Sequence, residues 1–302
     1  MSYTAEDQSN NMTFNKIAAT LLVIVCISSI AAFLFLNSLG QIRLIVRGDD
    51  MGFCHAANVD CIKAFQHGIL TSVEVMPPCD FFLEAVEMIN ENPGLDVGVH
   101  LTLNSEWENI KWGPLTKAPS LVDENGYFFP MTWPDEAYPP SMSLGTSEWK
   151  LEGIEKELRS QIELVLHYLP QCSHATPHMA FNSISPHVNA LAYKLVKEYK
   201  IDANIRILPL QQISLFGDAY THEEMVANAV DVLKNLKPGT WQFYEHPGML
   251  IEGEERGWHI GAEDDAIYRD NVTKTLINEE LMNVIEERNI ELIGYNDLRF
   301  WQ

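Results

Sequence analysis

Residues 42–52 read IRLIVRGDDMG and combine a strand signal with two adjacent acidic side chains. The run from Ile42 to Val46 is apolar and rich in β-branched residues, which is typical of a buried strand, and it stops at Gly48. Asp49 and Asp50 follow directly. Because adjacent carboxylates repel each other, a pair at a strand end is expected either in a solvated turn or beside a cation or a shared proton. The pair alone leaves both interpretations open.

Helical and strand-like stretches alternate after this segment. A helix is predicted through Val59, Ile62 and Phe65 up to Gly68, and Ser185-Pro186 is a typical helix start. Further helices are predicted over 80–89 and 151–165, and further strands over 69–76, 95–103, 204–208, 240–244 and 290–295. Strands that alternate with helices predict an α/β fold with a mostly parallel sheet, open or closed into a barrel.

The N-terminal region differs in character from the rest of the chain. Residues 17–36, IAATLLVIVCISSIAAFLFL, contain neither a charged residue nor a proline. At about 1.5 Å per residue, they match the roughly 30 Å hydrocarbon core of a bilayer. They predict a transmembrane anchor or a signal segment after a polar tail over 1–16, with Ser38-Leu39-Gly40 as a candidate cleavage site. The domain over 41–302 is then expected outside the cytoplasm, either anchored to the membrane or secreted (periplasmic) after cleavage.

Charge and cysteine content narrow the classes of partner. The chain has 42 acidic and 20 basic residues, a net charge of −22. Glu6, Asp7 and Lys16 give the first 40 residues a net −1, so nearly all the negative charge lies on the domain. Such a surface repels phosphate backbones, and no nucleic-acid partner is expected. Cys26 lies in the apolar segment, and the other four cysteines allow three pairings, with free buried thiols as the default.

Histidines at predicted strand ends suggest a metal site. The parallel α/β architecture gathers the carboxyl ends of strands, where sites of this fold class lie. His100 lies in GVHLTL at 98–103, His174 and His178 in SHATPH at 173–178, and His246 in EHPG at 245–248. Taken singly, each could be a satisfied core histidine or a surface histidine. With one Asp of the 49–50 pair, two of them form a nitrogen and oxygen donor set suited to zinc or a similar divalent ion. Because Pro177 favours an extended backbone, we expect only one of His174 and His178 to face the site.

Five stretches, in order, resemble one family. RGDDMG at 47–52 looks like the Asn-Ala-Asp-Asp-Phe-Gly opening of the YdjC-like carbohydrate deacetylases, the group that includes chitooligosaccharide deacetylase. The other four are GVHL at 98–101, PSLVDENGYF at 119–128, EHPG at 245–248 and IELIGYNDL at 290–298. The resemblance extends from about residue 42 to residue 299.

The resemblance implies a deacetylase-like (β/α) barrel that hydrolyses N-acetylated oligosaccharides with a divalent ion, Mg²⁺ or Zn²⁺. It implies metal ligation by Asp50, His100 and His178, with Asp49 as the general base and His246 as the general acid. It also implies that Arg206 orients Asp49 or contacts the substrate. Membrane contact through residues 17–36 is expected if the segment is uncleaved. Whether the chain forms a homodimer is left open.

One motif departs from the family pattern. The family has Asp and Ser where this chain has Thr176 and Pro177, so the histidine spacing is kept but a carboxylate that could orient an imidazole is missing. This departure motivates a non-catalytic carbohydrate-binding barrel as one alternative. Deacetylation of a glycolipid or a cell-envelope glycan is the other, and a membrane anchor would suit it.

The stretch over 105–147 is unusually aromatic. A long aromatic connection over the mouth of a barrel could act as a substrate lid that stacks on sugar rings, or it could pack its rings against the domain. Its aromatic residues are Trp107, Trp112, Tyr127, Phe128, Phe129, Trp133 and Tyr138.

Overall fold

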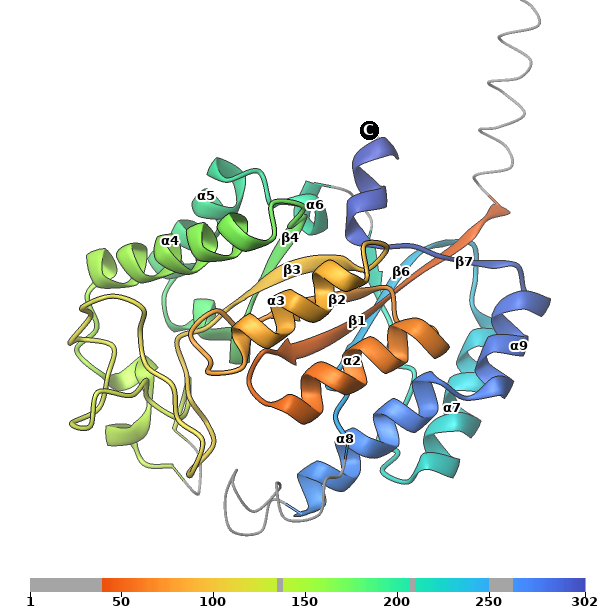
Figure 1. The fold of residues 1–302 in the computed structure, drawn as a ribbon, viewed down its shortest axis with the longest axis horizontal. Helices are drawn as coiled ribbons and strands as arrows, with labels where there is room; N and C mark the ends of the chain where they lie inside the picture. Colours follow the sequence, from red (N-terminus) through yellow and green to blue (C-terminus); the bar gives the residue numbers. More distant parts are fainter. Residues whose placement is uncertain (1–39, 135–137, 207–209, 250–262, 302) are drawn as a thin grey trace, which may run out of the picture.

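The computed structural model describes residues 40–134, 138–206, 210–249 and 263–301 (Figure 1). The predicted polar tail over 1–16 and the apolar segment over 17–36 lie outside these residues. Among the helices that are described, none is long and apolar enough to cross a membrane.

Seven parallel strands form one sheet in the described part of the chain, with β1 (Ile42–Met51) at its centre. The sheet order is β4-β3-β2-β1-β6-β5, and β7 pairs with the first residues of β1. The other strands are β2 (Ser72–Val75), β3 (Asp96–Leu101), β4 (His174–Pro177), β5 (Leu210–Gln212), β6 (Gly239–Glu245) and β7 (Ile290–Leu292). In the described residues β4 and β5 remain edges, so the predicted barrel is a half-barrel here rather than a closed ring.

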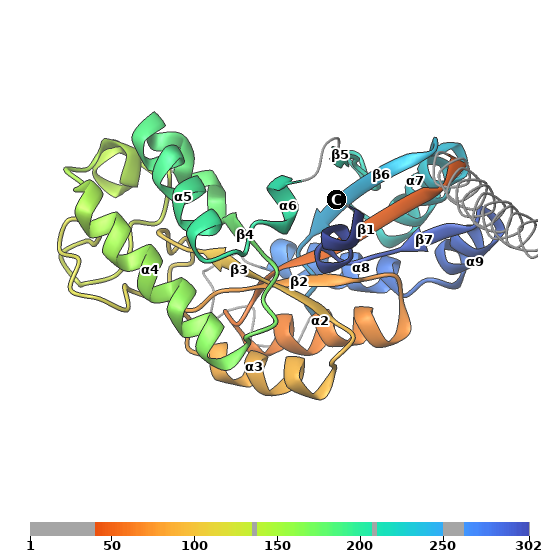
Figure 2. The ribbon, with the colours of Figure 1, turned by 90° about the horizontal axis from the view of Figure 1, so that it is seen from above.

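Helices lie at both ends of the sheet and along one side of it (Figure 2). In Figure 2, α4 and α5 lie at one end of the molecule, α2 and α3 lie along one side, and α7 and α9 lie at the other end. The helices are α2 (His55–His67), α3 (Phe82–Glu91), α4 (Leu151–Tyr168), α5 (Pro186–Glu198), α6 (Ala203–Arg206), α7 (His222–Asn235), α8 (Glu263–Leu276) and α9 (Glu279–Glu287). Short 3₁₀ segments occur at Pro140–Met142, Leu144–Thr146, η3 (His178–Ile184) and Tyr295–Trp301.

Most predicted elements are confirmed, with shifts of a few residues at their ends. Gly68 follows α2 directly, and Ser185 caps α5 by accepting a hydrogen bond from the backbone N–H of His187. The strand predicted over 204–208 is wrong where the chain is described, because Ala203–Arg206 is helical. The Ala203 N–H donates to the carbonyl of Ser173, and the Asn204 amide donates to that of Ala175. These bonds tie the segment to the β4 region in place of pairing within the sheet.

The strands β1, β2 and β3 are buried on both faces, as the inner strands of helix-covered parallel sheets are. Every residue of β1 is buried, and Leu44, Val73 and Val97 on three neighbouring strands are fully buried. Gly98 in β3 leaves room for the ring of His174, since a Cβ at this position would lie 2.4 Å from His174 Nε2. The polar ring of His174 is therefore buried against β3, beside the apolar core.

The long connection between β3 and α4 is held by a buried carboxylate. Glu157 of α4 is fully buried and accepts hydrogen bonds from the backbone N–H groups of Leu115 and Thr116, both at 3.0 Å. One turn further on, Gln161 exchanges hydrogen bonds with both backbone groups of Thr102, at 2.8 and 2.9 Å. The connection is thus anchored to a helix and not only to the strand that it leaves.

Replacing Glu157 by Ala is expected to lower the free energy of unfolding by about 2 kcal/mol, because two backbone N–H groups lose their acceptor. Urea unfolding followed by circular dichroism measures this change. Glu152→Ala, at an exposed position of the same helix, is the control and should change stability by less than about 0.5 kcal/mol. Equal effects of the two substitutions would contradict the anchoring role.

Candidate metal centre and active-site cavity

The end of β1 departs from a regular strand at the acidic pair. In a regular strand neighbouring side chains point to opposite faces, but Asp50 has a left-handed backbone with φ of 65°. The register between β1 and β2 also shifts between Gly48 and Met51. Irregularities of this kind redirect side chains next to active sites. Here both carboxylates are buried beside one cavity: Asp49 lines it, and Asp50 contacts histidines that line it.

Asp50, His100 and His178 converge on one point. Asp50 Oδ1 lies 3.4 Å from His100 Nε2 and 3.3 Å from His178 Nδ1, and the three donor atoms all lie within 4.8 Å of one another. All three residues are buried. Among the described residues, Asp50 Oδ1 has no hydrogen-bond donor. A buried carboxylate oxygen without a donor, facing two imidazole nitrogens, fits a divalent cation.

The donor set also favours certain ions. Two imidazoles and one carboxylate suit zinc and other first-row transition metals, whereas magnesium prefers sites built only from oxygen. Of the two ions that the family resemblance implies, these residues fit Zn²⁺ better than Mg²⁺.

Carboxylates lie at the outer nitrogens of both histidines. His100 Nδ1 lies 3.0 Å from Glu74 Oε2 and 2.9 Å from Thr176 Oγ1. His178 Nε2 lies 3.0 Å from Glu106 Oε2. Thr176 replaces an expected Asp, yet neither imidazole lacks an orienting carboxylate. Glu74 on β2 and Glu106 in the long connection supply the carboxylates.

Two arginines hold the acidic pair. Arg47 donates two hydrogen bonds to Asp49, at 2.6 and 2.8 Å, and Arg269 of α8 donates to Asp50 Oδ2 at 2.9 Å. Burial opposes the charge on Arg47, but the Asp49 carboxylate outweighs this effect and the pKa of Arg47 lies well above its ordinary value. Arg206, predicted to orient Asp49 or to contact substrate, belongs to α6, and its side chain lies outside the described part of the chain. In the described residues Arg47 orients Asp49, and the role of Arg206 stays a prediction.

His246 and His174 have different surroundings. His246 lines the cavity with 35% of its side chain exposed, and its Nε2 lies 3.7 Å from Asp50 Oδ2. This position at the rim would let it exchange a proton with a bound ligand. His174 is fully buried against Tyr295 and does not line the cavity, whereas His178 does. The prediction that only one histidine of this pair faces the site is confirmed.

The cavity has a volume of about 560 Å³ and one unusual wall. Met179 and Ala180, the second and third residues of η3, both have left-handed backbones, with φ of 48° and 51°. The long connection packs against this wall, since Thr132 Oγ1 donates to the Met179 carbonyl and Trp133 Nε1 donates to Ser183 Oγ. A turn with left-handed backbone therefore forms one wall of the cavity, and the aromatic connection is hydrogen-bonded to that turn.

Most aromatic side chains of the connection pack into the domain. Trp107, Trp112 and Phe128 are buried, as the packing interpretation predicts. Tyr127 and Trp133 are exposed, at 41% and 44%.

Four charged residues of the site were not predicted from the sequence, although the sequence around two of them contains a pattern that could have indicated a role in the site. Arg47 stands two residues before Asp49 and so shares its strand face. Glu74 is a charge inside the otherwise apolar stretch VEV of a predicted buried strand. Glu106 and Arg269 lie in a connection and in a helix rich in charges, where nothing in the pattern singles them out.

Protons would compete with a metal ion for the nitrogen atoms of His100 and His178. Burial disfavours charged imidazoles, but the neighbouring carboxylates of Asp50 and Glu74 outweigh this effect and raise the pKa of His100 to about 9. For His178 the carboxylates of Glu106 and Asp50 overcome the same penalty and raise its pKa to about 10. Without metal, both imidazoles therefore carry protons at neutral pH, and ligation must displace them.

Zn²⁺ affinity is accordingly expected to increase as the pH rises from 6.5 toward 9, with about two protons released per ion near pH 7. Isothermal titration calorimetry in buffers of different ionisation enthalpy measures both the affinity and the released protons. An affinity independent of pH, with no proton release, would show that the two histidines are not the ligands.

The chain is similar to known proteins in both sequence and fold. Residues 43–287 match the family model described as YdjC-like protein. A protein of Clostridium beijerinckii named carbohydrate deacetylase is 29% identical, covering 85% of this chain and all of that protein. An Enterococcus faecalis carbohydrate deacetylase is 27% identical over 85% of this chain and 98% of its own length. A crystal structure from Enterococcus faecalis, provisionally assigned as a cellobiose-phosphate cleavage protein, shares the fold with a TM-score of 0.67. It is 23% identical and covers 85% of this chain and 99% of that one.

Proposed function

The chain belongs to the YdjC-like protein family, and on that premise we propose that it is a metal-dependent hydrolase that removes acetyl groups from N-acetylated carbohydrates. One observation carries the proposal. Asp50, His100 and His178 converge as a donor set beside a cavity that Asp49 and His246 also line. Metal ligands, a carboxylate base and a half-exposed histidine at one cavity are the groups that amide hydrolysis needs.

Each residue of the site has a defined task in this proposal. Asp50, His100 and His178 would hold the ion, which supplies Lewis-acid chemistry by polarising a carbonyl and making water easier to deprotonate. Arg47 holds both oxygens of Asp49, so this carboxylate is aimed to take the proton of the attacking water. His246 at the rim donates a proton to the departing amine of the sugar. Arg269 holds Asp50 in place by donating a hydrogen bond to Oδ2.

The two alternatives concern substrate and activity. Glu74 and Glu106 weaken the case for a non-catalytic sugar-binding barrel, because both imidazoles have a carboxylate partner despite Thr176. A glycolipid or cell-envelope substrate stays a prediction, as do membrane attachment through residues 17–36 and an extracytoplasmic location. A homodimer also stays a prediction.

Alanine at Asp50, His100 or His178 is expected to abolish both metal content and acetate release. Asp49→Asn should keep the metal but lower acetate release at least about 100-fold, since only the base is lost. Elemental analysis and an acetate assay over a panel of N-acetylated sugars measure both quantities.

His187→Ala is the matched control, because His187 is an exposed histidine on α5. It should leave metal content and activity unchanged. Full activity in any of the three alanine variants would contradict the proposed ligand set. Sugar binding by the wild-type chain, without bound metal and without acetate release, would favour the non-catalytic sugar-binding barrel.

Trp133 is the aromatic side chain of the connection best placed to meet a sugar. Its indole N–H donates to Ser183 Oγ at 2.9 Å, which fixes the ring against η3. The neighbouring Thr132 bonds to Met179, which lines the cavity. An exposed ring at this place can stack on a sugar unit next to the one that reacts. This geometry favours an oligosaccharide over a monosaccharide as the substrate.

Trp133→Ala is expected to raise KM for an N-acetylated oligosaccharide about tenfold, a loss of about 1.4 kcal/mol, with little change for the monosaccharide. Steady-state kinetics with both substrates provide the measurement. Tyr127→Ala is the comparison, because Tyr127 is equally exposed but lies in the turn that joins Val122 to Phe128. Identical KM values in wild type and Trp133→Ala would leave the ring without a substrate role.

A further inference from the structure

Glu74 is a charged residue at the centre of the sheet. It lies in β2 between Val73 and Val75, and all three side chains are fully buried. A carboxylate in such a place costs several kcal/mol unless other charged or polar groups compensate for it. Its surroundings therefore indicate what it does.

Glu74 contacts groups from three neighbouring strands. One oxygen, Oε2, lies 3.0 Å from His100 Nδ1 and accepts a hydrogen bond from the Thr176 hydroxyl. The other oxygen, Oε1, lies 3.2 Å from His174 Nε2 and 3.9 Å from Arg47 Nη1. Two acceptor oxygens, from Glu74 and Thr176, thus converge on Nδ1 of His100. A proton on Nδ1 leaves Nε2, the atom that faces Asp50, free to donate its lone pair.

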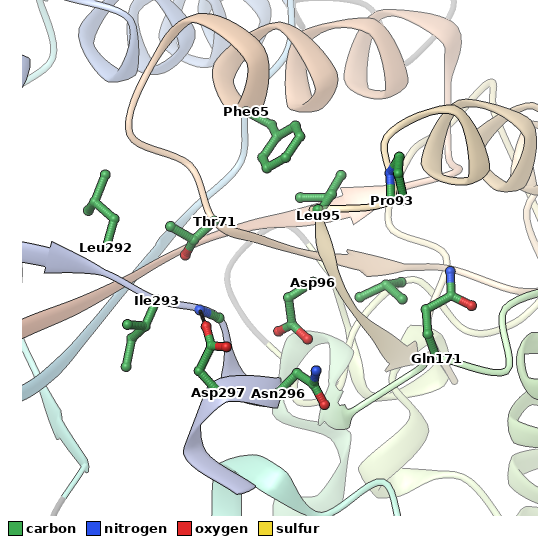
Figure 3. A pocket seen from close by; sticks show the side chains of 13 residues that line it. Phe65, Thr71, Pro93, Leu95, Asp96, Gln171, Leu292, Ile293, Asn296 and Asp297 are labelled. Carbon is green, nitrogen blue, oxygen red and sulfur yellow. Dashed lines mark hydrogen bonds between the residues drawn. The ribbon is translucent and has the colours of Figure 1, made fainter. Parts of the chain in front are cut away.

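The contacts of Glu74 continue through His174 to Asp96. His174 lies with Nδ1 2.8 Å from Ser173 Oγ and 3.6 Å from Asp96 Oδ2. Asp96 in turn accepts hydrogen bonds from Ser72 Oγ and from the backbone N–H of Tyr295. This row of acidic and imidazole groups crosses the sheet from the metal-centre side to the opposite end. There Asp96 borders a separate cavity of about 280 Å³, where it points toward Asn296 and Asp297 (Figure 3).

We propose that Glu74 is a positioning residue of the metal centre, which holds His100 with Nε2 turned toward Asp50. The inference rests on the proposed function only through the metal centre and does not depend on the substrate. Thr176 cannot fill this role alone, because its hydroxyl proton is given to Glu74 and it brings no negative charge.

The sheet register makes the proposal testable by moving the carboxylate. His100 on β3 is paired with Thr176 on β4, and Thr176 Oγ1 lies 2.9 Å from the nitrogen that Glu74 contacts. A carboxylate at position 176 would therefore reach the same nitrogen from the other side. If Glu74 acts by orienting His100, Glu74→Ala combined with Thr176→Asp should work nearly as well as the wild-type chain.

The experiment measures Zn²⁺ and Co²⁺ binding to the purified full chain, without any substrate. Glu74→Gln and Glu74→Ala are expected to weaken Zn²⁺ binding 10- to 100-fold. They should also change the visible absorption of the Co²⁺-loaded protein, which reports ligand geometry. The double variant Glu74→Ala/Thr176→Asp should recover Zn²⁺ affinity to within a few-fold and restore the Co²⁺ spectrum.

The matched control is Glu84→Gln, which makes the same change at another carboxylate that contacts a histidine. Glu84 lies 2.8 Å from His55 Nδ1, and neither residue lines the cavity. Its Zn²⁺ affinity and Co²⁺ spectrum should match those of wild type. Urea unfolding of each metal-free variant separates lost stability from lost metal affinity, and if one Glu74 variant does not fold, the double variant decides the question.

Three results would count against the inference. Wild-type Zn²⁺ affinity and an unchanged Co²⁺ spectrum in Glu74→Gln would overturn it. A folded double variant as weak as Glu74→Ala would also overturn it, because a carboxylate on either strand should suffice. A wild-type chain that binds no divalent ion would overturn the proposed function, and this inference with it.

Discussion

The structure depends on balancing buried charge at the centre of one sheet. Asp49, Asp50 and Glu74 are all buried, and each would be costly without a partner. Arg47 and Arg269 neutralise the acidic pair, while imidazoles surround Asp50 and Glu74. The left-handed backbone of Asp50, the glycine opposite His174 and the wall formed by Met179 and Ala180 all accommodate this cluster. The apolar core provides stability around it, and the cluster explains why the backbone departs from regular geometry at these points.

Parallel strand order gathers the cluster from distant parts of the sequence. Asp50, Glu74 and His100 belong to three adjacent strands, and His178 directly follows a fourth. Arg269 comes from α8 and Glu106 from the connection after β3. No single segment contains a complete site. A chain that formed its helices but shifted one of these strands by one residue would point that strand's member of the cluster away from the cavity.

The sequence predicts the alternating elements and the metal donor set better than the supporting residues. The predicted ligand trio comes together because each member follows or ends a recognisable strand. Glu74 carries a usable signal, a charge within an apolar strand, but its meaning depends on its neighbours across the sheet. The strand predicted at 204–208 fails because an apolar stretch cannot reveal that the Asn204 amide bonds to Ala175 in place of sheet pairing. The role of Glu106 depends on how a long connection folds back, which local periodicity does not encode.

The two imidazoles of the metal centre are supported in different ways. His100 is braced by Glu74 and Thr176, which belong to strands of one rigid sheet. His178 is braced by Glu106, which belongs to the same aromatic connection as Trp133. In the proposed function, a sugar that contacts this connection would therefore also stabilise the position of His178 and, by thermodynamic reciprocity, a bound ion would stabilise the position of the connection. Binding of the ion and binding of the sugar would thus be coupled through His178, whereas His100 is held by the sheet alone.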